Sequence, residues 1–264
     1  MSGERLPEGS SGSDGQPEPI ETPHDWRPAR FMAIFAHPDD ADFGPAGTAA
    51  TWIDAGSTGW LVCCTSGDAG SEDAEQDPMA LAAVREAEQR AAAEVIGYEG
   101  VSFLHQPDGA LANDLALREL LVREIRSFRP DAVITSDPEV VFRKDRGVNH
   151  TDHRAAGMAA ADAVFPAARN PMAFPSLVGE GLLHHRVRRL YLSGSNQPTV
   201  RVDIGDRLDR KLEALSRHAS QLAGDGQSVE NVRRRAVDEG AIIGTAAAEP
   251  FRLIVIDPDE APPT

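Results

Sequence analysis

The sequence predicts an α/β fold built on a doubly wound, mostly parallel sheet flanked by helices. The order of strand followed by helix repeats four times from residue 31 onward, which is the pattern of a parallel sheet with helical crossovers. The expected strands are continuous apolar runs, as in strands buried on both faces. The length of 264 residues suits one full-sized domain.

The elements follow from apolar runs and from breaker residues. Pro38 cannot donate a ladder hydrogen bond, so the first strand must end before it, and Gly97 is well placed to end a long helix. Strands are expected at 31–36, 60–65, 101–104, 131–135, 187–192, 200–204 and 251–256. Helices are expected at 44–55, 78–97, 114–128, 155–164, 206–222 and 229–239, with 136–149 a long polar loop and 166–185 irregular.

The two ends of the chain differ in composition from the rest. Residues 1–24 are rich in Gly, Ser, Pro and Glu and hold too little apolar surface to fold. We predict a disordered N-terminal tail at 1–27, a single domain at 28–258 and a C-terminal tail at 259–264. Trp26 is expected to pin the end of the N-terminal tail to the domain.

Composition excludes several classes of function. A net charge of −16 without a Lys/Arg block argues against nucleic acid and anionic membranes as partners. No apolar run approaches the length of a membrane span. The first residues lack a charged region followed by an apolar region, so secretion through a signal peptide is not expected. No G-x-G-x-x-G follows the first strand, so nothing marks a dinucleotide site. Cys63 and Cys64 are neighbours that point to opposite faces of a strand, which predicts buried, reduced thiols and a cytoplasmic protein.

A polar cluster follows the first strand and is the strongest chemical signal. His37, Asp39, Asp40 and Asp42 come where open α/β sheets place ligands, past the carboxyl end of a strand. Three acids beside an imidazole repel one another unless a positive charge lies among them, and a divalent cation is the simplest such charge. The adjacent carboxylates of Asp39 and Asp40 point differently, which suits one of them to act as a base.

A second histidine pair comes later in the chain. His150 and His153 are three residues apart near a helix start, so they share one face. Two histidines and one carboxylate around zinc, with water in the fourth position, form a hydrolytic zinc site. One acid and one histidine are left over for proton transfer and for oxyanion stabilisation. Taken alone, His-x-x-His also fits a solvated helix face.

Two further positions allow more than one interpretation. Arg85 lies on the margin of the apolar stripe of its helix, where it either pairs with Glu88 or reaches a substrate at the sheet edge. Asp108-Gly109 is a turn signal in its own right.

These residues resemble the signature of the PIG-L-type (LmbE-like) zinc-dependent N-acetylglucosamine deacetylases. The similarity covers most of residues 31–222 and is most specific in its first motif. Its motifs are Ala36-His37-Pro38-Asp39-Asp40 with Asp42 and Gly44, Thr65-Ser66-Gly67-Asp68, Arg85-Glu86-Ala87-Glu88, Pro107-Asp108-Gly109, His150-Thr151-Asp152-His153-Arg154 and His218-Ala219-Ser220-Gln221.

The resemblance implies a Rossmann-like fold and a role for each matched residue. It implies that His37, Asp40 and His153 are the metal ligands, with Zn²⁺ or another divalent metal as cofactor. It also implies that Asp39 is the general base and that His150 is the general acid or oxyanion partner. The residues implied to bind substrate are Arg85, Asp108 and Asp68.

The chain departs from the family pattern at two carboxylates. Many members have Glu immediately after the two aspartates or two positions after, where this chain has Ala41 and Asp42, and often Glu in place of Asp68. Each carboxylate present is one methylene shorter. The motif His218-Ala219-Ser220-Gln221 receives no role from the sequence.

The expected function is removal of an N-acetyl or other N-acyl group from a GlcNAc-type amino sugar by metal-activated water. One alternative is an amidase acting on a larger thiol conjugate or glycoconjugate. Another is a non-catalytic protein that binds a sugar or a metal. The expected partner is a small amino-sugar substrate. Neither nucleic acid binding nor membrane insertion is expected, and the sequence allows a homo-oligomer. Residues 136–149 and 166–185 are expected to shape the substrate pocket.

Overall fold

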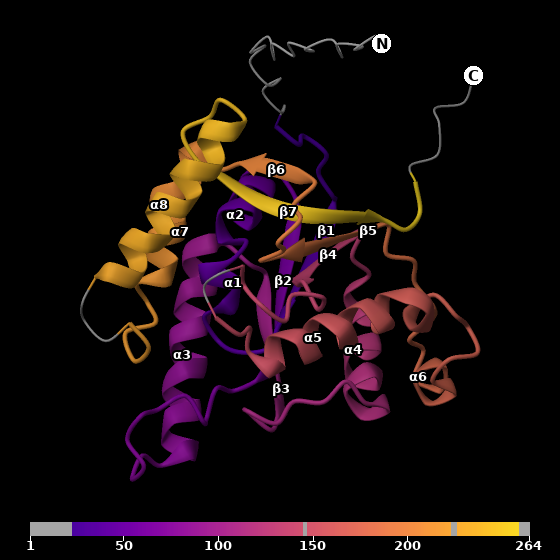
Figure 1. The fold of residues 1–264 in the computed structure, drawn as a ribbon. Helices are drawn as coiled ribbons and strands as arrows, with labels where there is room; N and C mark the ends of the chain where they lie inside the picture. The colour runs from indigo at the N-terminus through magenta and orange to yellow at the C-terminus, as the bar shows by residue number, and fades with distance from the viewer. Residues whose placement is uncertain (1–22, 145–146, 223–225, 259–264) are drawn as a thin grey trace, which may run out of the picture.

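The computed structural model describes residues 23–144, 147–222 and 226–258. They contain one seven-stranded sheet with the order β3-β2-β1-β4-β5-β7-β6 (Figure 1). β1 to β5 pair in parallel, while β7 is antiparallel to both β5 and β6. The strands are β1 (Arg30–Phe35), β2 (Thr58–Thr65), β3 (Gly100–Gln106), β4 (Ala132–Ser136), β5 (Arg189–Ser193), β6 (Val200–Asp203) and β7 (Ala248–Val255).

Helices cover both faces of the sheet, which confirms the doubly wound α/β fold. Alternate residues of β1 belong to different cores: Met32 and Ile34 pack with α4 and α5, whereas Phe31, Ala33 and Phe35 pack with α2 and α3. In Figure 1, α3 lies on one side of the sheet and α4 and α5 on the other. The helices are α1 (Asp40–Phe43), α2 (Ala46–Asp54), α3 (Pro78–Ile96), α4 (Leu115–Phe128), α5 (Thr151–Asp162), η1 (Ala163–Ala168), α6 (Pro175–Gly179), η2 (Gly205–Arg207), α7 (Leu208–Leu215) and α8 (Gln227–Ile242).

Several expected boundaries differ from the structure. The helix expected at 206–222 ends at Leu215 as α7, because residues 216–222 turn back and bring His218 to Asp42. The helix expected from 155 begins at Thr151, so the second histidine pair lies at its first turn. Residues 166–185 are not wholly irregular, since they contain part of η1 and all of α6.

Most of the predicted N-terminal tail (residues 1–22) and all of the predicted C-terminal tail (259–264) lie outside the described residues. Close to residue 23, Trp26 stacks on Tyr191 with ring centroids 6.3 Å apart, and His24 Nε2 lies 2.9 Å from the Tyr191 hydroxyl. The expected pinning by Trp26 is therefore confirmed, while the boundary at 28 stays a prediction. Cys63 and Cys64 are buried and free, and no described helix is long and apolar enough to span a bilayer.

The strand order explains why the two histidine segments meet. Successive strands are added on one side of β1 up to β3 and on the other side from β4 onward, and such a switch point between β1 and β4 opens a crevice at the carboxyl ends of the strands. β1 runs directly into His37, and β4 leads through residues 137–150 into α5. The carboxyl ends of neighbouring parallel strands lie at one edge, so the two segments converge there.

The approach of α5 to the end of β4 depends on Gly157. A Cβ added at this position would lie 2.2 Å from the backbone carbonyl oxygen of Ser136. We expect Gly157→Ala to lower the free energy of unfolding by about 1–3 kcal/mol, because backbone on both sides cannot yield easily. Urea denaturation measures the change. Gly179→Ala is the matched control, since a Cβ at Gly179 meets nothing within 4 Å; an equal effect of both substitutions would contradict the prediction.

A buried ion pair ties β7 and α7 to the N-terminus of α2. Lys211 Nζ lies 2.6 Å from Glu249 Oε1 and also donates to the carbonyl of Gly44. The Glu249 carboxylate in turn accepts the backbone N–H groups of Gly47 and Thr48, at 2.9 and 2.7 Å. The carboxylate therefore satisfies helix donors that have no partner within the helix.

Removing one member of this pair is expected to destabilise the fold. Lys211→Met leaves the buried Glu249 carboxylate without its cation, which typically costs about 3–5 kcal/mol. The change is read from urea denaturation. Adding Glu249→Gln to Lys211→Met should recover part of the loss, because the neutral amide needs no counter-ion. A double variant less stable than Lys211→Met would contradict the electrostatic explanation.

Candidate metal and active site

The predicted ligands His37, Asp40 and His153 lie together at the mouth of the sheet. The Asp40 carboxylate lies between the two rings, with Oδ1 3.0 Å from His153 Nε2 and Oδ2 3.4 Å from His37 Nδ1. The His37 and His153 ring centroids are 5.2 Å apart. Two imidazoles and a carboxylate at such distances fit the donor set of a mononuclear divalent metal site.

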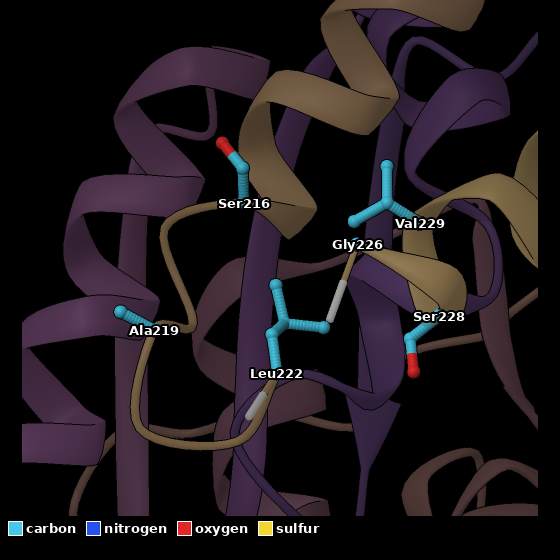
Figure 2. Close-up of a pocket in the computed structure, with 6 residues that line it drawn as sticks. All are labelled: Ser216, Ala219, Leu222, Gly226, Ser228 and Val229. Atoms are coloured by element: carbon cyan, nitrogen blue, oxygen red, sulfur yellow. The ribbon is translucent and has the colours of Figure 1, made fainter. Parts of the chain in front are cut away.

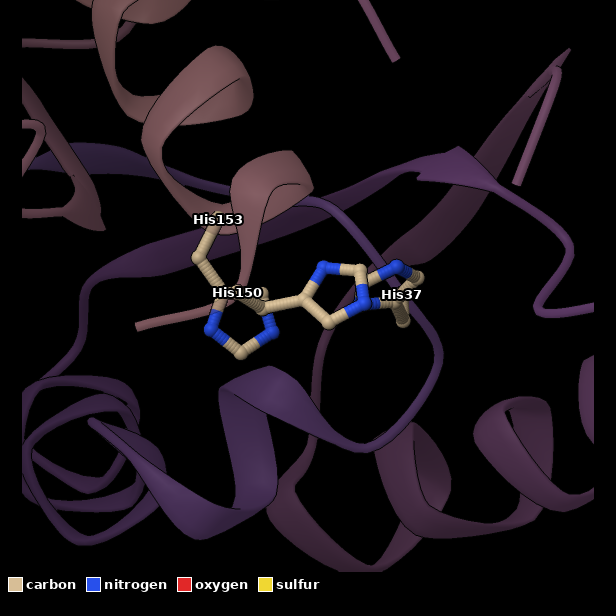
Figure 3. A group of neighbouring side chains, drawn as sticks. All are labelled: His37, His150 and His153. Carbon is tan, nitrogen blue, oxygen red and sulfur yellow. The ribbon is translucent and has the colours of Figure 1, made fainter. Parts of the chain in front are cut away.

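His150 brings a third imidazole to the same place (Figure 3). Its ring centroid lies 4.9 Å from that of His37 and 5.2 Å from that of His153. As the N-cap of α5, its Nδ1 accepts the backbone N–H of Asp152 at 3.1 Å. Burial, together with the neighbouring rings of His37 and His153, lowers the pKa of His150. Because Nδ1 accepts the hydrogen bond from the Asp152 N–H, the neutral form of the ring carries its proton on Nε2.

Among the described residues, two groups have one donor atom from each of three residues lying within 4.8 Å of one another. One is His37, His150 and His153; the other is His37, Asp108 and Asp152. Asp40 is in neither group, although its two oxygens lie 3.4 and 3.0 Å from His37 Nδ1 and His153 Nε2. The geometry thus brings the predicted ligands together and also offers a three-histidine set.

The carboxylates around His37 create a site for positive charge. Asp108 Oδ1 lies 2.9 Å from His37 Nε2, and Asp152 Oδ2 lies 3.4 Å from the same atom. Burial alone lowers the pKa of His37, but hydrogen bonds to Asp108 and Asp40 reverse the effect and raise it to about 10. Burial raises the pKa of Asp40, yet the contacts with His153 and His37 bring it well below its usual range. The cluster stabilises a cation, as a metal site must.

Asp39 lies beside this cluster in an unusual backbone conformation. Its φ of 95° is in the left-handed region, which costs a non-glycine residue on the order of 1–3 kcal/mol. Its carboxylate Oδ2 lies 3.3 Å from Arg85 Nη2. Burial first, and then the negative charge of Asp40, raise the pKa of Asp39 to about 7, against the lowering effect of Arg85. A carboxyl group with that pKa can accept a proton near neutral pH.

Arg85 is buried and turned toward the site, so the expected alternative of an ion pair with Glu88 is wrong. Its guanidinium donates to the carbonyls of Gly67 and Pro38, at 2.9 and 2.8 Å. Glu88 instead accepts the backbone N–H and the hydroxyl of Ser220. Arg85 Nε is buried without a described partner, and the residue lines the cavity.

Asp108 and Asp68 differ in their placement. Asp108 lines the cavity, and its Oδ2 accepts the backbone N–H of Ala69 at 2.8 Å. Burial raises the pKa of Asp108, but the hydrogen bonds from His37 and Ala69 and the positive charges of His37 and Arg85 together outweigh burial, and the pKa falls to about 2. The described residues that line the cavity include Ala69 and Gly70 but not Asp68. The structure therefore does not bring Asp68 to the cavity with the other predicted residues.

The cavity at the histidine cluster has a volume of about 890 Å³. Arg143 and Lys144 of the polar loop line it, as expected for 136–149, whereas no described residue of 166–185 does, so that expectation was wrong. Sequence reasoning missed its other wall, which α8 and β7 form. That wall carries no motif, so no local signal identifies it.

Sequence reasoning also left His218 without a role. His218 Nε2 lies 2.9 Å from Asp42 Oδ2, and both side chains are 1% exposed. The only sequence signal was a polar motif in an otherwise mixed helix, and the partner lies 176 positions away along the chain.

A smaller hollow of about 260 Å³ lies between the end of α7 and the start of α8 (Figure 2). It offers no acid, base or metal ligand, because its lining residues carry no titratable side chain; they are Ser216, Ala219, Leu222, Gly226, Ser228 and Val229.

Comparison with known proteins agrees with the geometry of the site. The family model described as PIG-L, GlcNAc-PI de-N-acetylase, matches residues 32–164. The chain is 29% identical over 227 residues to a diacetylchitobiose deacetylase of Thermococcus kodakarensis, covering 85% of this chain and 83% of that protein. It is 30% identical to a mycothiol S-conjugate amidase of Streptomyces coelicolor, covering 70% of this chain and 68% of the other.

The fold comparison points the same way. The structure of N,N'-diacetylchitobiose deacetylase from Pyrococcus horikoshii superimposes with a TM-score of 0.80 at 28% identity, covering 88% of each chain. The matched region includes every element that carries a candidate residue from His37 to His153.

Proposed function

The chain belongs to the PIG-L family of metal-dependent de-N-acetylases, and from that premise we propose that it hydrolyses the N-acetyl group of a GlcNAc-type amino sugar. The observation that carries this proposal is the convergence of His37 and Asp40, after β1, with His150 and His153, at the start of α5. The names of the relatives support the class of substrate.

We assign the metal to His37, Asp40 and His153, and propose zinc, because a set of two nitrogens and one oxygen is common at hydrolytic zinc sites. When bound there, the metal polarises the amide carbonyl and makes an attacking water more acidic. The surrounding carboxylates suit a divalent cation, although such a set does not select zinc by affinity alone.

The residues beside the ligands divide the proton chemistry. Asp39 accepts the proton of the attacking water, a role that its pKa of about 7 supports. His150 has Nδ1 engaged by the Asp152 N–H, so its Nε2–H is the group available to donate to the developing oxyanion. The proton that Asp39 takes up is the one that the departing amine needs, delivered directly or through His150. Arg85 and Asp108 are the proposed contacts to sugar hydroxyls, and Asp68 is a weaker candidate.

An amidase acting on a larger conjugate is the second candidate. The relative in Streptomyces coelicolor supports it, as does the cavity of about 890 Å³, which lies in the upper range of small-molecule sites. We further propose a cytoplasmic location, which free buried cysteines support; a homo-oligomeric state is a prediction for solution measurements.

The test is amide hydrolysis, measured as liberated primary amine with acetate quantified in parallel, on a panel of substrates by protein loaded with one divalent metal at a time. The panel contains N-acetylglucosamine, its disaccharide and N-acylated thiol conjugates of glucosamine. We expect turnover of at least one acetylated sugar, lost on chelation and restored by zinc. Preference for the thiol conjugates would favour the amidase. Retained metal without release of amine from any acylated substrate would favour a non-catalytic binding protein.

A further inference from the structure

A chain of buried hydrogen bonds runs behind Asp39, away from the cavity. The backbone N–H of Asp39 donates to Gln89 Oε1 at 2.8 Å. Gln89 Nε2 donates to Asp42 Oδ2 at 2.8 Å, and His218 Nε2 lies 2.9 Å from the same oxygen. Gln89, Asp42 and His218 are 0–1% exposed. The chain joins α3, α1 and the turn after α7, three segments distant in sequence.

The donors and acceptors in this series of hydrogen bonds allow only one orientation of the Gln89 amide. The backbone N–H of Asp39 can only donate, so it needs the amide oxygen of Gln89, and the NH₂ group of Gln89 is left to donate to Asp42 Oδ2. A hydrocarbon at this position would leave that buried N–H without its acceptor.

The hydrogen bond from the Asp39 N–H to Gln89 is important for the backbone of Asp39, because this residue has a positive φ of 95°. Such a conformation persists only where the surroundings over-determine it. The carbonyl of Asp39 accepts the backbone N–H groups of Asp42 and Phe43, at 2.8 and 2.9 Å. With Gln89 on the N–H, both sides of the residue are held, and the direction of the carboxylate follows from the backbone.

We propose that Gln89, oriented by Asp42 and His218, is a positioning residue that holds Asp39 at the angle from which its carboxylate takes the proton. This inference rests on the proposed function, in which Asp39 is the base. It also gives a role to His218, whose motif the sequence left unexplained. Gln89 does not itself line the cavity, and its described hydrogen bonds go to Asp39 and Asp42 and not to the proposed ligands, so it acts through Asp39.

A double-mutant cycle tests whether Gln89 acts through Asp39. We expect Gln89→Met, which keeps the volume and removes both hydrogen bonds, to lower kcat by about tenfold to hundredfold, as small misplacements of catalytic groups do. KM and metal content should stay near wild type. In an Asp39→Asn background the same substitution should lower kcat no further, because the group that it positions is gone. Equal losses in both backgrounds would overturn the proposal.

A second readout does not depend on activity. The Asp39 amide should exchange with solvent faster in Gln89→Met than in the wild type, followed by NMR on the full chain. Ala92→Gly is the matched control, since Ala92 is a buried residue of α3 outside this hydrogen-bond chain. It destabilises the same helix, and it should leave kcat and the relative protection of Asp39 unchanged. Unchanged protection in Gln89→Met would overturn the proposal.

Two outcomes separate this inference from the proposed function. Wild-type protein that releases no acetate from any substrate overturns the proposed function, while faster exchange at Asp39 would still support the positioning contact. An active wild type together with a Gln89→Met variant of undiminished kcat overturns the inference alone. If Gln89→Met does not fold, Gln89→Asn replaces it: it keeps both polar groups but is one methylene too short to bridge Asp39 and Asp42, so kcat should still fall.

Discussion

Asp39→Asn should lower kcat by at least about 10²-fold while the protein keeps its metal. General-base catalysis contributes about 10²–10⁴-fold, and an amide of the same shape cannot accept the proton. The proposed ligands His37, Asp40 and His153 are unchanged, so metal content should match the wild type. Acetate release at saturating substrate measures kcat, and elemental analysis measures the metal.

Asp73→Asn makes the same chemical change in an exposed loop and serves as the control; it should leave kcat unaltered. Full activity of Asp39→Asn would remove Asp39 as the base. Loss of metal from Asp39→Asn would instead place this carboxylate among the ligands.

His153→Ala should lose the metal, whereas His150→Ala should keep it and lose turnover. Loss of an outer partner typically costs 10–100-fold in metal affinity, so we expect loss of a direct ligand to cost at least about 100-fold. The affinity is measured by competition with a chromophoric chelator. His150 lies in the same cluster, with its centroid 5.2 Å from that of His153, and is therefore the matched comparison.

The pair of variants also decides between the two possible donor sets. If His150→Ala loses the metal and Asp40→Asn retains it, the three histidines are the ligands and Asp40 is a partner of their rings. If Asp40→Asn loses the metal and His150→Ala retains it, the assignment to His37, Asp40 and His153 stands.

The main elements of the fold were predictable because their signals are local. The continuous apolar run of residues 31–36 is buried between two helical layers, as its lack of alternation indicated. The meeting of His37 with His150 and His153 was also predictable, because parallel strands bring their carboxyl ends to one edge. The antiparallel pairing of β7 with β5 and β6 was not, since apolar runs do not indicate strand direction.

The contacts of Arg85 could not be predicted from the local sequence. Its place on the helix was readable, but a helical wheel does not tell which neighbouring loop approaches. The structure brings Gly67 and Pro38 against the guanidinium, and Glu88 to Ser220. Local sequence likewise does not tell which way a loop residue faces, so Asp68 was predicted in the site although it does not line the cavity.

By itself, the sequence determined which residue types stand at the ends of β1 and before α5, and so the chemistry at the mouth of the sheet. Only the tertiary structure decided what holds that chemistry in place. Gln89 and His218 are brought to Asp39 and Asp42 from 47 to 176 positions away in the chain, and α8 and β7 close the cavity. Such contacts depend on how helices pack over the sheet, which neither periodicity nor a short motif encodes.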